Sequence, residues 1–159
     1  MQINVLEYFE HGALAKCPDK VAVVDHDHRY TFAELERFAK NCAALILRHT
    51  ATFNHPIAVF LPKGATTIIA DLGILYSGNG YANLDFKSPP ERLKTILQNL
   101  GTSLIITSSA PSAVLRGLGV PESQLLMVEA AMTPESVYVN ATLTERLNKV
   151  IDTDLLCII

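Results

Sequence analysis

Residues 56–85 read PIAVFLPKGATTIIADLGILYSGNGYANLD, and this stretch decides the fold class of the chain. The unbroken apolar run over residues 57–61 is typical of a strand that is buried on both faces of a sheet. Apolar residues at helical spacing follow over residues 64–77, and a Gly-Asn-Gly turn leads into a second short strand over residues 81–84. A strand, an amphipathic helix and another strand predict a β-α-β unit, in which the two strands run parallel.

The same alternation continues towards the C-terminus. Leucine and isoleucine recur at helical spacing over residues 90–100, and Gly101 predicts the end of that helix. We expect Ser88 to cap its N-terminus, with proline at the first helical position. Apolar runs over residues 104–107 and 125–128 predict two further buried strands. The predicted class is therefore α/β, a mostly parallel sheet flanked by helices.

Upstream of this region, the pattern predicts a helix over residues 5–16 and then a β-hairpin with strands over residues 21–24 and 29–31. Thr31 and Glu34 have the spacing of a capping box. The threonine hydroxyl accepts a hydrogen bond from the amide of residue 34, and the glutamate carboxylate reaches back to the amide of residue 31. Apolar residues at helical spacing follow, so the capping box opens a long amphipathic helix.

The composition fits a globular protein. With 159 residues, of which 49% are hydrophobic, the chain is long enough to bury a core. Charged residues make up 18%, which argues against wholesale disorder. We divide the chain into residues 1–52, with the first helix, the hairpin and the capped helix, and residues 53–159, the parallel α/β subdomain. Both are expected to be parts of one larger domain.

Charge and cysteine content exclude several classes of protein. The formal net charge is −3, and lysine and arginine are scattered, so we expect no nucleic-acid partner. Cys17, Cys42 and Cys157 are odd in number and lack C-x-x-C spacing, which argues against a zinc knuckle or a redox motif. The sequence shows neither a signal peptide nor an apolar stretch of membrane-spanning length. We therefore expect a cytoplasmic protein with no membrane partner.

Some local patterns indicate chemistry that their context does not support. A dinucleotide-binding fingerprint follows a strand, whereas the Gly78-Asn79-Gly80 turn follows a helix. Residues 63–66 (KGAT) resemble part of a phosphate-binding Walker loop but lack its upstream glycine. His26-Asp27-His28 offers no recognisable third metal ligand, so we interpret it as a polar hairpin turn. No serine lies in a G-x-S-x-G elbow.

Lys63 and Lys87 directly follow predicted strands. Ligands often bind at such positions in open α/β sheets. We nevertheless interpret both residues as surface lysines.

Three stretches, taken in order, resemble the adenylate-forming superfamily, which includes peptide-synthetase adenylation domains, acyl-CoA synthetases and luciferases. Residues 30–35 (YTFAEL) resemble its early Tyr/Leu-Thr-Tyr-x-Glu-Leu motif. Residues 75–85 (LYSGNGYANLD) are similar to Leu-Lys-Ala-Gly-x-Ala-Tyr-Val-Pro-Leu-Asp, and the similarity continues into residues 90–93 (PERL). Residues 154–159 (DLLCII) look like the strand before the Gly/Ser/Thr-rich phosphate loop of the family, and we expect a central strand there.

The motif residues that carry the resemblance are Tyr30, Thr31, Glu34, Leu35, Gly78, Tyr81, Asp85, Pro90, Glu91, Arg92 and Leu93. We interpret them as structural, in caps, turns and packing. None is assigned a catalytic, cofactor-binding or metal-binding role. Tyr76 and Asn83 depart from the motif, where lysine and proline are common.

The resemblance implies a flavodoxin-like N-terminal subdomain of a ligase that uses ATP and Mg²⁺. In such enzymes a carboxylate, of an amino acid or another acid, attacks the α-phosphate of ATP and gives an acyl-adenylate and pyrophosphate. The acyl group then passes to the thiol of CoA or of a carrier protein. The phosphate loop, the Mg²⁺ ligands and the catalytic lysine of the family all follow the region resembled here. We therefore expect a chain truncated before the phosphate loop, inactive by itself and without bound ATP or Mg²⁺.

The expected partners are the remainder of the adenylation domain and, for the intact enzyme, CoA or a carrier protein. Apolar surface exposed over residues 1–50 is expected to cause self-association. Two alternatives stay open: a stand-alone, non-catalytic flavodoxin-like binding module, and a fragment that folds alone and regulates an intact homologue. The residues encoded after Ile159 distinguish these readings, because a loop ending in Pro-Lys-Gly indicates the adenylating family.

Overall fold

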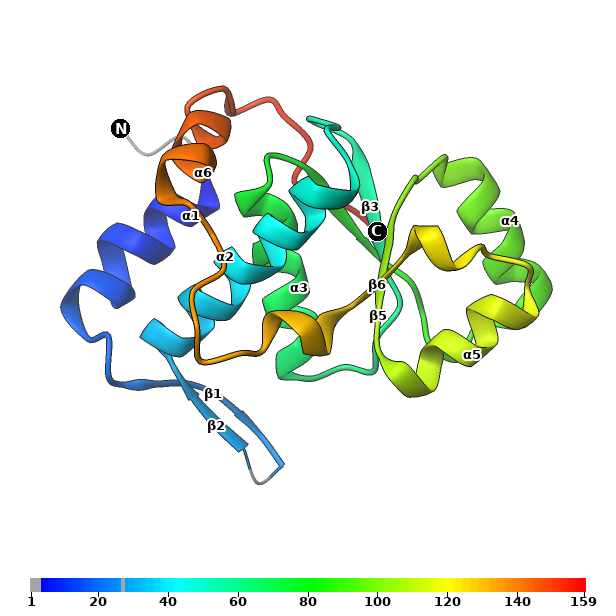
Figure 1. Ribbon diagram of the computed structural model, residues 1–159, viewed down its shortest axis with the longest axis horizontal. Coiled ribbons are helices and arrows are strands. Elements are labelled where there is room, and N and C mark those ends of the chain that lie inside the picture. The colour runs from blue at the N-terminus through cyan, green and yellow to red at the C-terminus, as the bar shows by residue number, and fades with distance from the viewer. Residues whose placement is uncertain (1–3, 27) are drawn as a thin grey trace.

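A five-stranded parallel sheet forms the centre of the protein, as the computed structural model shows for residues 4–26 and 28–159 (Figure 1). The strands of this sheet are β3 (Pro56–Val59), β4 (Gly80–Asn83), β5 (Ile105–Thr107), β6 (Leu125–Met127) and β7 (Cys157–Ile158). They lie in the order β6-β5-β3-β4-β7, and each neighbouring pair runs parallel. The predicted α/β class with a mostly parallel sheet is confirmed.

Helices connect these strands. They are α3 (Ala65–Tyr76), α4 (Pro90–Leu100), α5 (Ser109–Gly117) and α6 (Asn140–Leu147), with short 3₁₀ segments η2 (Glu122–Gln124) and η3 (Val128–Ala131). The sequence predicted α3 and α4, and Gly101 ends α4 in the left-handed region at φ 61°. Helices α5 and α6 are not predicted from the sequence pattern. Both helices present few apolar side chains to the core, and Leu143 is the buried residue of α6.

The two faces of the sheet are covered by different helices (Figure 1). On one face, α3 and α2 (Phe32–His49) share a core with Ile57 and Val59 of β3. On the other face, α4 and α5 pack around Ala58 and Phe60. Successive side chains of a strand point to opposite faces. The unbroken apolar run over residues 57–61 therefore serves two cores.

The N-terminal segment consists of a helix, a hairpin and α2. Its elements before α2 are α1 (Val5–Tyr8), a π-helical segment η1 (Phe9–Leu14), and the antiparallel strands β1 (Val21–Asp25) and β2 (His28–Thr31). The hairpin projects from the body of the protein in Figure 1. Its turn residue Asp27 lies outside the described residues. Helix α2 packs closely along α3 and shares a core with it, across the predicted boundary. The division into residues 1–52 and 53–159 stays a prediction.

One local expectation was wrong. Ser88 does not cap α4: the N-cap is Pro89, which is extended and forms no side-chain cap bond, and the helix begins at Pro90. A residue before proline avoids the helical region, which moves the start of the helix beyond residue 89. The terminal apolar run was expected to be a central strand. Residues 157–158 do form a strand, β7, which pairs with β4. That it is central in a larger domain stays a prediction. Strands β3 to β6 follow the flavodoxin order 2-1-3-4.

Candidate functional site beside the switch point of the sheet

The connections that follow β3 and β4 leave the sheet towards opposite faces. The chain after β3 enters α3, which belongs to one core, and the chain after β4 enters α4, which belongs to the other. In the flavodoxin strand order the switch point lies between the first and third strands, here β3 and β5, and ligands of open α/β proteins bind outside the carboxyl ends of the strands in this region. The carboxyl ends of β3 and β4 adjoin this switch point. The topology therefore places a candidate site at the carboxyl ends of β3 and β4.

A hollow of about 660 Å³ lies at this position. It is lined by residues of both connections: Leu61, Pro62, Lys63, Thr67, Asn83, Leu84, Asp85, Phe86 and Lys87. The Phe86 ring stacks on Phe60 at a centroid distance of 5.2 Å, so the half-exposed ring is fixed as an apolar wall. We call this hollow the switch-point hollow.

Two ammonium groups flank the switch-point hollow. Lys63 and Lys87 are both exposed, as expected for surface lysines, and neither forms an ion pair with any described carboxylate. The Asp85 carboxylate accepts a hydrogen bond of 3.0 Å from the Lys87 amide and so shapes the turn after β4. The lining contains no histidine, cysteine or serine. Its chemistry thus suits binding of an anionic group more than proton transfer or nucleophilic attack.

The N-terminus of α3, just beside this hollow, is already occupied by a side chain of the protein. The Ala65 amide donates a hydrogen bond of 2.8 Å to Oδ2 of Asp25, which reaches over from the hairpin. A Cβ atom on Gly64 would lie 2.5 Å from the same oxygen, so glycine is needed for this approach. The carboxylate takes the place at the helix N-terminus where a phosphate would otherwise bind. The KGAT segment is therefore a strand-to-helix connection, as predicted, held by Asp25.

The first group of motif residues forms the start of α2. Oγ1 of Thr31 accepts from the Glu34 amide at 3.2 Å, and the Thr31 amide donates to Oε2 of Glu34 at 2.9 Å. The bond from this amide is the main reason that the pKa of Glu34 lies below its ordinary value. Leu35 is buried in the core shared with α3, and Tyr30 packs edge-on against Phe38. The capping box is confirmed.

The second group of motif residues builds the turn around β4. Gly78 has φ 77°, and a Cβ atom there would lie 2.6 Å from the Phe53 ring, so the turn from α3 to β4 requires glycine. Tyr81 lies in β4 and packs on the core of α2 and α3. Leu93 is buried against the opposite face of the sheet. The motif residues are thus distributed over both cores and do not converge on one site.

The remaining motif residues form the first turn of α4. Pro90 occupies the first helical position, and the Glu91 carbonyl accepts the Thr95 hydroxyl at 3.0 Å. The side chains of Glu91 and Arg92 are exposed.

Tyr76, one of the two departures from the motif, belongs to a buried polar cluster between α3, α2 and η1. Its hydroxyl donates to Oε1 of Glu10 at 2.9 Å. The Lys40 ammonium lies 5.2 Å above the Tyr76 ring and forms ion pairs with Glu10 at 3.2 Å and Glu36 at 2.6 Å. Burial lowers the pKa of Lys40, but the two carboxylates outweigh burial and raise it overall. Where the motif has lysine at position 76, this chain places the ammonium group of Lys40 above a tyrosine ring.

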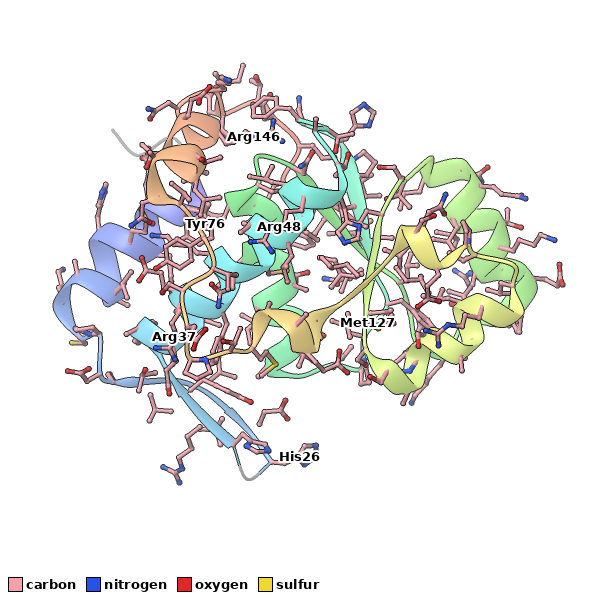
Figure 2. The ribbon with its side chains drawn as sticks, in the orientation of Figure 1. His26, Arg37, Arg48, Tyr76, Met127 and Arg146 are labelled. Atoms are coloured by element: carbon pink, nitrogen blue, oxygen red, sulfur yellow. The ribbon has the colours of Figure 1, made fainter. Side chains whose placement is uncertain are left out.

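Sequence reasoning missed two further groups of polar residues. Asn41 and Asn79 are both buried. The Asn41 side chain forms three hydrogen bonds to residues more than 80 positions away, and the Asn79 side chain forms two to residues 52 and 55 and one to the Ser77 hydroxyl. Arg146 of α6, labelled in Figure 2, donates to the Ser77 carbonyl at 3.1 Å and lies over the Phe53 ring. These residues have no local sequence signal, because their partners are brought together only by the tertiary fold.

Metal binding finds no support among the described residues. No group of three or more histidine, cysteine, aspartate or glutamate side chains converges in residues 4–26 and 28–159. His26 is exposed at the tip of the hairpin, away from the sheet (Figure 2). In the same part of the chain, none of the helices has the length and apolar character needed to span a membrane.

A parallel sheet covered on both faces, with a ligand-sized hollow beside its switch point, defines an open α/β protein, a class in which ligands bind outside the carboxyl ends of the strands. The sequence profile of the AMP-binding enzyme family matches residues 9–158, and the chain belongs to this family. The resemblance to adenylate-forming enzymes is therefore confirmed.

The chain is similar to known peptide synthetases in sequence and in fold. The chain is 33% identical to the beauvericin nonribosomal cyclodepsipeptide synthetase of Beauveria bassiana over 136 residues, which cover 85% of the chain and 4% of the synthetase. The AMPPNP-bound nonribosomal peptide synthetase FmoA3 shares its fold, with a TM-score of 0.71, 24% identity, and coverage of 84% of this chain and 14% of that one.

The O-succinylbenzoate coenzyme A synthetase of Bacillus subtilis, in complex with AMP, also has this fold. Its TM-score is 0.69 at 19% identity, over 87% of this chain and 34% of the synthetase. The chain thus spans a small part of the relatives it matches.

Proposed function

We propose that this chain serves as the N-terminal subdomain of an adenylation domain that activates an amino acid. The observation that carries the proposal is the family match over residues 9–158. It is supported by the peptide-synthetase relatives and by the motif at residues 75–85, which resembles the amino-acid-activating branch. The reaction is attack of the carboxylate on the α-phosphate of ATP with Mg²⁺ bound. Transfer of the acyl group to a thiol follows.

The described residues contribute a scaffold and a binding surface to this reaction. The switch-point hollow has two ammonium groups and no histidine, cysteine or serine, its Asp85 carboxylate is bonded to the Lys87 amide, and the N-terminus of α3 is occupied by Asp25. A transition state at the α-phosphate needs several backbone amides and a cation aimed at the developing charge. We therefore propose that the 159 residues alone neither bind ATP nor form an adenylate.

The switch-point hollow supports a role in holding the acyl acceptor. Both CoA and the phosphopantetheine arm of a carrier protein contain phosphate, and the exposed ammonium groups of Lys63 and Lys87 are unpaired among the described residues. Phosphate is a strong acceptor for such donors. We propose that these two lysines hold a phosphate of the acceptor while its thiol reaches the acyl-adenylate.

ATP–pyrophosphate exchange with a panel of amino acids tests the main proposal. It is measured for this chain and for the protein encoded by the complete reading frame that contains it. We expect amino-acid-dependent exchange for the latter, with a Pro-Lys-Gly loop encoded after Ile159, and no exchange for the 159 residues. A reading frame without that loop, together with no exchange, would support the non-catalytic binding module. Saturable micromolar binding of ATP to the 159 residues would show that the phosphate site has been misplaced.

A further inference from the structure

Asn83 of β4 lines the switch-point hollow, at a position where the motif of the family commonly has proline. Its Nδ2 donates a hydrogen bond of 3.0 Å to Oδ2 of Asp71 in α3. Asp71 lies one helical turn after Thr67, which also lines the hollow. The bond between Asp71 and Asn83 therefore connects α3 to the end of β4 directly beside the hollow.

This bond fixes which end of the Asn83 amide faces Asp71. An ionised carboxylate only accepts hydrogen bonds, so the amide presents its nitrogen to Asp71 and turns its oxygen away. Asn83 is exposed, and its Oδ1 accepts no hydrogen bond within the described part of the chain. Ionised Asp71 thus leaves a fixed and free acceptor in the lining that also contains Lys63 and Lys87.

The neutral form of Asp71 reverses this arrangement. Its Oδ1 is buried and has no hydrogen-bond partner among residues 4–26 and 28–159, so a proton on this oxygen would find no acceptor. A proton on Oδ2 can be donated to Asn83 only when the amide turns its oxygen inward. Burial raises the pKa of Asp71 to about 6, against an opposing effect of the Asn83 hydrogen bond. The ionised form, and with it the outward oxygen, therefore prevails at pH 7.5.

No cation is paired with this carboxylate. Asp71 takes part in no salt bridge with any other described residue. Burial raises the pKa of the Cys42 thiol of α2 and of the Tyr81 hydroxyl of β4, and the charge of Asp71 adds to both effects. Both groups are thus neutral where Asp71 titrates, so burial and the Asn83 bond set its titration.

We propose that Asn83 is a specificity-determining residue of the switch-point hollow and that Asp71 is its positioning residue. The ionised carboxylate turns the amide oxygen of Asn83 outward, and this oxygen accepts a hydrogen bond from an amide N–H of the pantetheine arm. The inference rests on the proposed function of the hollow, in which Lys63 and Lys87 hold the phosphate of the same arm. The lysines recognise any phosphate, whereas Asn83 recognises the arm that carries it.

The size of the effect follows from one hydrogen bond at an exposed site. Such a bond strengthens binding by about threefold. Without Asp71 the amide has two orientations, and equal populations of the two would reduce a threefold gain to about twofold.

Two phosphate monoesters test the inference: phosphopantetheine, and hexyl phosphate, which has the same phosphate group but no amide. NMR shifts of the 159-residue chain at pH 7.5 give both dissociation constants, and their ratio reports on the arm alone. We expect N83L to weaken phosphopantetheine about threefold and to leave hexyl phosphate unchanged. D71L should lower the preference for phosphopantetheine about 1.5-fold. N99L, at an exposed asparagine of α4 outside the hollow, is the matched control and should keep the wild-type ratio.

The pH profile separates a positioning role of Asp71 from a merely structural one. Between pH 7.5 and pH 5 the wild-type preference for phosphopantetheine should be largely lost, because the neutral acid turns the Asn83 oxygen inward. The phosphate titrates alike in both ligands, so its contribution cancels in the ratio. The D71L preference should not change with pH. A constant wild-type preference over this range would overturn the positioning role, and this measurement requires no variant.

The outcomes distinguish this inference from the proposed function. If K63Q/K87Q weakens both ligands while N83L leaves their ratio unchanged, the inference alone is overturned. An equal loss of both ligands in N83L also overturns it, since Asn83 would then act on the fold or on the phosphate. If neither ligand binds at millimolar concentration, or if K63Q/K87Q has no effect, the proposed function of the hollow fails and the inference fails with it.

Discussion

One buried side chain of α2 forms hydrogen bonds to three backbone groups of the segment of residues 131–137, whose first residue, Ala131, also packs in the core. Nδ2 of Asn41 donates to the carbonyls of Ala131 at 3.1 Å and Glu135 at 2.9 Å, and Oδ1 accepts from the Val137 amide at 2.9 Å. Asn41 is fully buried, and its bond to the Ala131 carbonyl is buried, whereas those to Glu135 and Val137 are partly buried. Replacing Asn41 with leucine keeps the branching at Cγ, with a somewhat larger side chain, and removes all three bonds at once.

The expected loss of stability follows from this geometry. Each buried hydrogen bond contributes about 1 kcal/mol net, and a backbone group left unpaired in the interior costs at least as much. Three groups lose their partner, so N41L should lower the free energy of unfolding by about 3 kcal/mol. For a protein of this size that corresponds to a fall in Tm of about 6 to 12 °C.

Urea unfolding followed by circular dichroism measures the free energy, and hydrogen exchange of residues 131–137 locates the change. N148L is the matched control, because Asn148 is exposed and its side chain forms no hydrogen bond among the described residues. We expect the control to change stability by less than about 0.5 kcal/mol. If N41L costs less than about 1 kcal/mol and residues 131–137 keep their protection, the side chain does not anchor the segment.

Three further changes test other parts of the structure. E34Q should destabilise the protein at pH 7, and the difference from wild type should disappear as the pH falls below 4.5, because the lowered pKa of Glu34 makes its stabilising effect dependent on ionisation. G78A should cost about 2 kcal/mol in urea unfolding, since it combines a positive φ with a clash against Phe53. The double variant K63Q/K87Q should weaken millimolar binding of phosphopantetheine, followed by NMR shifts, at least threefold.

Each of these variants has a control on the same chain. E91Q changes an exposed first-turn glutamate without a capping box, and G117A adds a methyl group where no atom lies within 4 Å. K94Q removes an exposed lysine of α4 outside the switch-point hollow. A control effect as large as that of its partner variant would contradict the corresponding structural argument.

Local features of the fold were predictable because their causes lie within a few residues of one another. The capping box of Thr31 and Glu34, the left-handed turn at Gly101 and the two-faced strand at residues 57–61 depend on short-range hydrogen bonds, backbone sterics and apolar spacing. The same local reasoning failed at Ser88, where Pro89 displaces the start of α4.

The sequence by itself thus determined the α/β class, most of the helices and strands, and the family, since each is written in periodicity and ordered motifs. Only the tertiary structure decided which strands are neighbours and where side chains distant in sequence meet. Asp25 at the N-terminus of α3, Asn41 beneath residues 131–137, and the lysines beside the switch-point hollow are examples. The reason is physical: such contacts depend on how the helices distribute over the two faces of the sheet, and that is set by packing of the whole core, not by any local spacing.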